Sequence, residues 1–162
     1  MFDDALLQLA ATLLEGCRER GIMLATAESC TGGLIAGALT AIPGASDVVE
    51  RGFITYSNQA KAEMLGIDPG LIETEGAVSR KVAIAMARGA LHHSPATLAL
   101  AVTGIAGPGG GTPEKPVGLV HVAAAIPGRA EHRECRFTDH GRDAIRRDTI
   151  MAALKLGLEI LG

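Results

Sequence analysis

The apolar positions along the chain fall into two repeating patterns, one helical and one extended. In the first segment they recur at spacings of three and four, which predicts a helix from Asp3 or Asp4 to about Arg20, ended by Gly21. Further helices are predicted, each near a capping serine, a Gly or a Pro-Gly pair, at 34–42, 58–65 (capped by Ser57 or Asn58), 80–92 and 142–161.

Short apolar runs between these helices predict strands. The two most apolar runs are 22–27 and 97–103, and each is followed by a glycine-containing turn. The remaining strands are predicted at 48–56 and 119–126, with a charged edge strand at 131–137. Helices that alternate with apolar strands indicate a three-layer α/β/α domain with a mixed, partly parallel sheet. No repeat or linker interrupts it, so we expect residues 1–162 to form a single domain.

Composition and charge narrow the function classes. The net charge of −3 disfavours a nucleic-acid binder, which needs a basic face, and the 2% aromatic content disfavours a base-stacking platform. Cys17, Cys30 and Cys135 are odd in number and lack a C-x-x-C spacing, which favours a reducing compartment over a disulfide framework. With an acidic N-terminus and no long apolar run, we expect a cytoplasmic protein without a membrane span.

The turn after strand 22–27 is the first candidate site. Ser29 lies between a strand and a helix, and the backbone N–H groups of Cys30, Thr31, Gly32 and Gly33 follow it. Such a helix N-terminus stabilises an oxyanion or holds a phosphate. The competing interpretation, favoured by position alone, is that Ser29 or Thr31 simply caps the next helix. If the two apolar strands are parallel, this turn and the later glycine-rich loop share one sheet edge.

A serine nucleophile needs a base, and none of the five histidines has a persuasive acid partner. Lys61 is the other candidate, since burial away from negative charge lowers the pKa of a lysine enough to leave a neutral amine. Tyr56, the only tyrosine, ends a predicted strand five residues before Lys61. In this arrangement the side chains of Tyr56 and Lys61 face the opening of the same site. The alternative is a surface lysine beside a rim tyrosine, and spacing alone does not decide between them.

Two further features suggest an anionic ligand. The glycine-rich loop at 104–118 matches neither phosphate-loop nor dinucleotide fingerprints, but its length favours a functional part over a passive connection. Arg142 and Arg146 lie one helical turn apart and suit a phosphate, or form an ordinary solvated first turn. No metal-ligand spacing is present, so we predict no metal and no cofactor.

Taken together, the motifs resemble the CinA C-terminal domain family, in its stand-alone form. The resemblance spans about Leu6 to Leu161, and its motifs occur in order: TAESCTGG at 26–33, PGAS at 43–46, YSNQAK at 56–61, GAVS at 76–79, VTGIAGPGG at 102–110 and KPVG at 115–118. The characterised activity of that family is nicotinamide mononucleotide amidohydrolase. The resemblance implies a serine amidohydrolase in pyridine nucleotide recycling, with Ser29, Tyr56 and Lys61 as catalytic set, acting as a homo-oligomer.

Substrate contacts follow from this assignment. We expect backbone donors from Cys30 to Gly33, a nucleotide pocket shaped by Thr103 and the glycine-rich loop, and a phosphate contact from Arg142 or Arg146. The loop positions concerned are Gly104, Gly107 and Gly109. Two alternatives stay open: a non-catalytic nucleotide-binding module, and a partner domain in DNA uptake or damage response, which the acidic charge disfavours for direct DNA contact.

Overall fold

A five-stranded mixed sheet forms the middle layer of the computed structural model, which describes residues 1–162. The strand order is β2-β1-β3-β4-β5. β1 runs parallel to β2 and β3, whereas β3–β4 and β4–β5 are antiparallel pairs. This confirms the mixed, partly parallel sheet. The strands are β1 (Leu24–Glu28), β2 (Val49–Ile54), β3 (Leu98–Gly104), β4 (Leu119–Ile126) and β5 (Arg129–Arg136).

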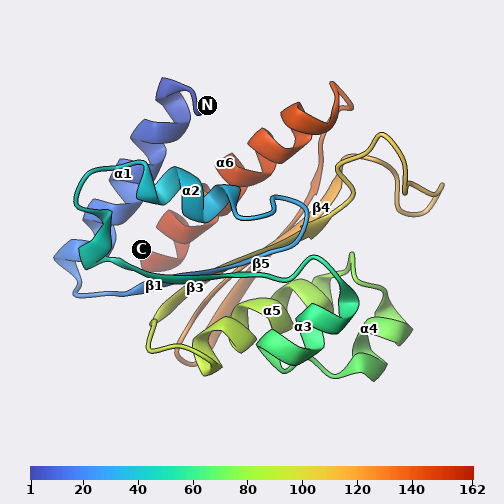
Figure 1. The fold of residues 1–162 in the computed structure, drawn as a ribbon, viewed down its shortest axis with the longest axis horizontal. Coiled ribbons are helices and arrows are strands. Elements are labelled where there is room, and N and C mark those ends of the chain that lie inside the picture. The colour runs from blue at the N-terminus through green and yellow to red at the C-terminus, as the bar shows by residue number, and fades with distance from the viewer.

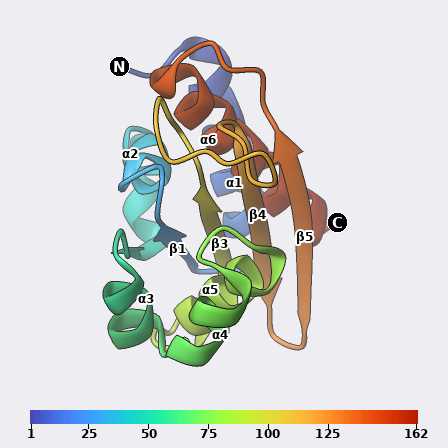
Figure 2. The same ribbon diagram turned by 90° about the vertical axis from the view of Figure 1, so that its right-hand side faces the viewer.

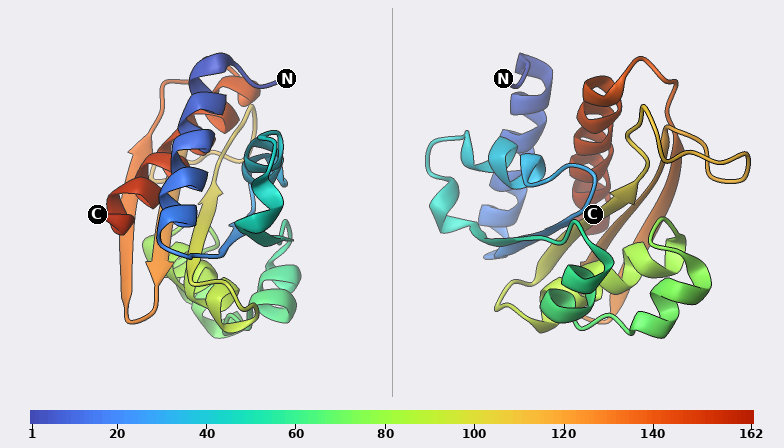
Figure 3. Two further views of the ribbon diagram at one scale, coloured as in Figure 1. Left: turned by 90° about the vertical axis from the view of Figure 1, so that its left-hand side faces the viewer. Right: turned by 45° about the vertical axis from the view of Figure 1, so that its right-hand side comes forward.

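Helices cover both faces of the sheet, which confirms the three-layer arrangement (Figures 1 and 2). One face carries α1 (Asp4–Glu19), α2 (Leu34–Thr40) and α6 (Arg142–Leu161). The other carries α3 (Asn58–Leu65), α4 (Pro69–Glu75) and α5 (Arg80–His92). Figure 3 shows α1 and α6 side by side on their face, with both chain termini on that side. A short 3₁₀ turn, Ala45–Asp47, precedes β2.

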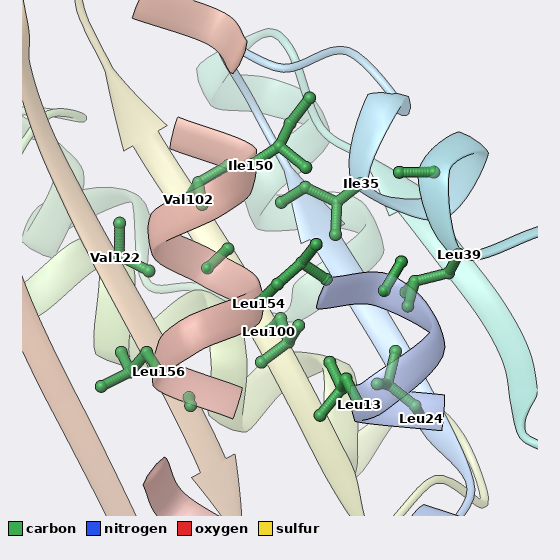
Figure 4. Close-up of a cluster of buried hydrophobic side chains, with 14 of the residues drawn as sticks. Leu13, Leu24, Ile35, Leu39, Leu100, Val102, Val122, Ile150, Leu154 and Leu156 are labelled. Atoms are coloured by element: carbon green, nitrogen blue, oxygen red, sulfur yellow. The ribbon is translucent and has the colours of Figure 1, made fainter. Parts of the chain in front are cut away.

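The two faces are packed with different side chains. Large aliphatic residues fill the space between the sheet and α1, α2 and α6, as Figure 4 shows for Leu13, Leu100 and Leu154. On the other face the strands present alanines, so α5 lies close to the sheet. An added Cβ on Gly89 of α5 would come within 2.3 Å of the Leu65 carbonyl oxygen, so α3 also packs in close contact with α5.

Most predicted boundaries agree with the structure, and the differences have physical causes. The strand predicted at 22–27 extends through Glu28, whose carboxylate is buried and fully hydrogen-bonded. β2 ends at Ile54, so Tyr56 lies in the following connection and not in a strand. The helix predicted at 34–42 ends at Thr40. The sequence analysis missed α4, which begins at an Asp68 cap with proline in its first turn.

The parallel pairing of β1 and β3 brings two turns to one sheet edge. Glu28 at the end of β1 is paired with Val102 in β3, and the N–H of Ser29 donates to the Val102 carbonyl oxygen at 3.1 Å. The turn 29–33 and the loop 105–118 therefore leave the sheet beside each other, which confirms the expected geometry. No helix of the chain is both long and apolar enough to cross a membrane.

Candidate functional site

The turn 29–33 contains the candidate nucleophile Ser29, is called the nucleophile turn for that reason, and is held by a carboxylate beneath it. Glu28 is fully buried, and its two carboxylate oxygens accept hydrogen bonds from the Thr31 hydroxyl and from the backbone N–H groups of Gly33, Ile35 and Ala36. Three otherwise unpaired donors of the first turn of α2 are thereby satisfied. Glu28 is a functional residue that sequence reasoning did not select, although a glutamate closing an apolar strand was the available signal.

This arrangement decides the capping alternative. The N-cap position of α2 is Gly33, with φ of 99°, and it makes no side-chain capping bond. Neither Ser29 nor Thr31 caps the helix, so the cap interpretation of Ser29 is wrong. The positive φ favours glycine here, because an L side chain is strained in this left-handed conformation; an added Cβ would also lie 2.9 Å from Ile54 Cδ1. The Ser29 hydroxyl is left available for other chemistry.

Lys61 reaches that hydroxyl from α3. Its Nζ lies 3.0 Å from Ser29 Oγ and 2.8 Å from the Thr55 carbonyl oxygen, and the side chain is only 1% exposed. Ser57 caps α3 and sets the helix so that its first turn carries Lys61 inward. The interpretation of Lys61 as a surface lysine is therefore wrong.

The electrostatic setting of Lys61 favours a neutral amine. Burial lowers its pKa below the usual 10.5, and no carboxylate forms an ion pair with it. In the structure Lys61 Nζ donates to the Thr55 carbonyl oxygen and to Ser29 Oγ. A neutral amine at this position has a lone pair directed at the Ser29 hydroxyl, which is what a proton acceptor requires. The Cys30 thiol beside it has its pKa raised by burial to about 12, so it stays protonated and is a poor nucleophile.

The sequence predicted that the N–H groups of all four residues from Cys30 to Gly33 are available to an anion, but only some of them are free. The N–H groups of Gly32 and Gly33 are already used, by the Ser29 carbonyl and the Glu28 carboxylate. The N–H groups of Cys30 and Thr31 donate to no other group of the protein, although both residues are buried. Buried N–H groups without a partner are rare, which makes these two the candidate donors for an anion. Cys30 lines the same pocket as Ser29, whereas Thr31 is fully buried and does not line it.

Tyr56 and Arg142 meet at the mouth of the same site. Tyr56 is 63% exposed, and its hydroxyl accepts a hydrogen bond from Arg142 Nη2 at 3.0 Å; it does not lie between Ser29 and Lys61. A second guanidinium nitrogen of Arg142 donates to the Gly107 carbonyl at 2.7 Å. One arginine of α6 thus connects the segment after β2 with the glycine-rich loop.

Arg146 has a different place. Its Nε and Nη2 donate to the carbonyl oxygens of Cys30 and Thr31, both at 3.1 Å. The two arginines that the sequence grouped together therefore separate: Arg142 borders the pocket, and Arg146 binds the back of the nucleophile turn.

These groups surround one pocket of about 210 Å³. Thr103 forms part of its wall and donates from Oγ1 to the Ala77 carbonyl at 2.8 Å, which ties β3 to the segment before α5. The pocket is lined by Ser29, Cys30, Tyr56, Lys61, Ala77, Val78, Thr103, Gly104, Ala106 and Arg142. No histidine lines it.

Of the predicted glycines in the glycine-rich segment, Gly104 lines the pocket, whereas Gly107 and Gly109 do not. Gly104 and Gly107 lie close to β4 and its approach, where an added Cβ would be 2.6 Å from Val120 Cγ2 and from Val117 Cγ1. Gly109 lies in the exposed outer part, with no atom within 4 Å of an added Cβ, and does not line the pocket. Figure 1 shows this outer part projecting from the body of the molecule.

Comparison with known proteins identifies the family. The family model of the CinA C-terminal domain matches residues 6–161. The chain belongs to this family. It is 52% identical over 149 residues to a CinA-like protein of Mycobacterium avium (strain 104) and 50% identical over 149 residues to one of Synechococcus sp. (strain RCC307). These matches cover 89% and 91% of this chain but only 33% and 36% of those proteins, so the chain spans about a third of the curated relatives' length.

Solved structures of CinA superfamily proteins share the whole fold. The competence/damage inducible protein CihA from Agrobacterium tumefaciens is 53% identical, with a TM-score of 0.95 and coverage of 99% of this chain and 98% of that one. A competence-damaged protein (CinA) superfamily protein from Escherichia coli is 32% identical, with a TM-score of 0.92 and coverage of 99% and 94%.

Proposed function

We propose that this CinA-family chain is a serine amidohydrolase that converts the carboxamide of nicotinamide mononucleotide to the acid and ammonia. The contact that carries the proposal is the 3.0 Å approach of Lys61 Nζ to Ser29 Oγ, in a buried position without a carboxylate partner. A nucleophile beside its base is the arrangement that acyl transfer requires. The choice of nicotinamide mononucleotide among carboxamides rests on the family resemblance.

In the first half of the reaction the Ser29 oxygen attacks the carboxamide carbon, and its proton passes to Lys61 Nζ. The oxyanion that forms is stabilised by the free N–H groups of Cys30 and Thr31. When the C–N bond breaks, Lys61 returns the proton to the leaving nitrogen and ammonia departs. The direct Lys61–Ser29 contact makes a relay through the Tyr56 phenol unnecessary, so Tyr56 contacts the substrate at the pocket mouth.

In the second half Lys61 takes a proton from a water molecule, whose oxygen attacks the acyl carbon. The ester bond to Ser29 breaks, the serine recovers its proton from Lys61, and nicotinic acid mononucleotide leaves. The balance is one carboxamide and one water to one acid and one ammonia. Arg142 borders the pocket and is exposed, which supports its guanidinium as the contact for the substrate phosphate.

Ammonia release from nicotinamide mononucleotide tests the proposal. We expect turnover by the unmodified chain and none by Ser29→Ala, which keeps its affinity for the nucleotide. Ser94→Ala is the matched control, because it removes a hydroxyl at the far end of α5 from the pocket and leaves the rate unchanged. An unmodified chain that binds the nucleotide but releases no ammonia would support the non-catalytic module instead.

A further inference from the structure

A single guanidinium holds two consecutive carbonyls of the nucleophile turn, those of Cys30 and Thr31. We infer that Arg146 is a positioning residue that fixes one backbone donor of the oxyanion site, the N–H of Thr31; the inference rests on the proposed function and adds a residue to it. Arg146 is half-buried, comes from α6 and takes part in no ion pair. The hydrogen-bond partners that the structure gives its guanidinium are the carbonyl oxygens of Cys30 and Thr31.

Peptide geometry connects those carbonyls to the free donors. In a trans peptide the N–H points opposite to the carbonyl of the same unit. The carbonyl of Cys30 shares its unit with the N–H of Thr31, so a bond from Arg146 Nε to that oxygen directs the Thr31 N–H away from α6. The N–H of Cys30 is fixed in the same manner, because the Ser29 carbonyl of its unit accepts from Gly32.

The turn is held from both sides. From below, the Glu28 carboxylate fixes the Thr31 side chain and the N–H of Gly33. From α6, Arg146 is the side chain that binds the carbonyls of Cys30 and Thr31. Without it, the peptide unit between these two residues loses the bond that sets its orientation, and a rotated unit no longer presents the Thr31 N–H.

The position of Arg146 separates this role from phosphate binding. Arg142 lines the pocket that contains Ser29, whereas Arg146 lines a different cavity, of about 430 Å³, together with Leu34 and Ile150. Removal of Arg146 should therefore affect the chemical step and not the capture of the phosphate.

Arg146→Gln tests the inference through steady-state kinetics on two substrates. We expect kcat to fall about 100-fold, the loss typical of one oxyanion donor, with KM changed less than about 3-fold. The same factor should apply to nicotinamide mononucleotide and to nicotinamide riboside, which lacks the phosphate. A loss in KM confined to the mononucleotide would overturn the inference and make Arg146 a phosphate ligand.

Three comparisons exclude a merely structural effect. Arg147→Gln is the matched control, since Arg147 is the next residue, binds Asp3 at the surface and should leave kcat unchanged. Arg146→Lys keeps one donor and should recover part of the lost rate. Guanidinium ion added to Arg146→Ala should raise kcat, whereas no response to added guanidinium together with no recovery in Arg146→Lys would contradict a positioning role.

A substrate-independent readout keeps the inference separate from the amide reaction. A fluorophosphonate forms a bond from Ser29 Oγ to phosphorus, fluoride leaves, and Lys61 takes the proton. We expect Arg146→Gln to slow this labelling about 100-fold relative to Arg147→Gln. Slowed labelling in a chain that does not hydrolyse nicotinamide mononucleotide would support Arg146 and refute the substrate. Equal labelling of the two variants, or an unreactive Ser29 in the unmodified chain, would refute the inference.

Discussion

The two turns that meet at the pocket are fixed to very different extents. In the turn 29–33, the three carbonyls of Ser29, Cys30 and Thr31 all accept hydrogen bonds, and a buried carboxylate holds the helix behind it. In the loop 105–118, Arg142 and the first residues of β4 hold the inner end, Lys115 Nζ donates to the Glu75 carbonyl oxygen at 2.9 Å, and residues 108–114 are exposed. The turn is hydrogen-bonded to its surroundings at consecutive residues, whereas the loop is held at its two ends and its middle is exposed.

Under the proposed function, this difference corresponds to two chemical tasks. Stabilising a developing charge requires donors fixed in advance, because reorientation during the reaction would cost the energy that the donors supply. Surrounding a nucleotide requires reach and backbone freedom, which glycines provide. Substitutions in the first turn should therefore have large effects on rate or stability, and effects in the loop should decline from its inner to its outer end.

Among these substitutions, the largest effect is expected from replacing Lys61, the proposed base, which contacts Ser29 of the turn 29–33. Lys61→Met should lower kcat/KM about 1,000-fold, or about 4 kcal/mol, because the Ser29 hydroxyl loses its proton acceptor. The activity of the unmodified chain should rise with pH through the lowered pKa of Lys61, since only the neutral amine accepts the proton. Steady-state rates between pH 5 and 10 measure both, and a flat profile in that range would contradict Lys61 as the base.

The lowered pKa of Lys61 also determines in which direction the stability of the chain changes with pH. Its pKa is lower in the folded chain than the 10.5 of the unfolded one, so between these two values the unfolded state binds the extra proton. The free energy of unfolding of the unmodified chain, minus that of Lys61→Met, should therefore rise with pH across this window. The slope should approach about 1.4 kcal/mol per pH unit. Urea titrations of both chains test this, and a difference that falls with pH would refute it.

Removing the Glu28 carboxylate, which supports the turn 29–33, should cost less free energy than removing the proposed base Lys61. Glu28→Ala leaves three N–H groups at the start of α2 without an acceptor, one of them buried and two half-buried, and should lower the free energy of unfolding by about 3 kcal/mol. Glu63→Ala, on the exposed side of α3, is the control and should change it by less than about 0.5 kcal/mol. Equal urea midpoints for the two variants would show that the carboxylate does not hold the turn.

The smallest effects should come from two substitutions in the loop 105–118, one at its inner end and one in its exposed outer part. Gly107→Ala places a Cβ 2.6 Å from Val117 Cγ1 at a φ of 76°, and should destabilise the chain by about 2 kcal/mol. Gly109→Ala meets no atom within 4 Å and should change stability by less than about 0.5 kcal/mol. Thermal unfolding of both variants measures the gradient, and similar losses at the two positions would contradict an unattached outer loop.

The sequence predicted the fold more completely than the site. Element order, the mixed sheet and the caps at Ser57 and Ser79 follow from local patterns and agree with the structure. The missed helix α4 is short, and short helices carry weak periodicity. At the site, the sequence grouped Arg142 with Arg146 because they share one helix, and it overlooked Glu28 because its bonds run to residues that lie beyond a turn.

The chain's residue order by itself determined which segments are helical or extended and that a serine turn and a glycine-rich turn follow the two most apolar strands. These are properties of neighbouring residues, and local periodicity and propensity encode them. Only the tertiary structure decided that Lys61 is buried against Ser29, that Tyr56 pairs with Arg142, and that Arg146 binds the nucleophile turn. Burial and long-range hydrogen bonds depend on how distant segments pack, and no local pattern specifies them.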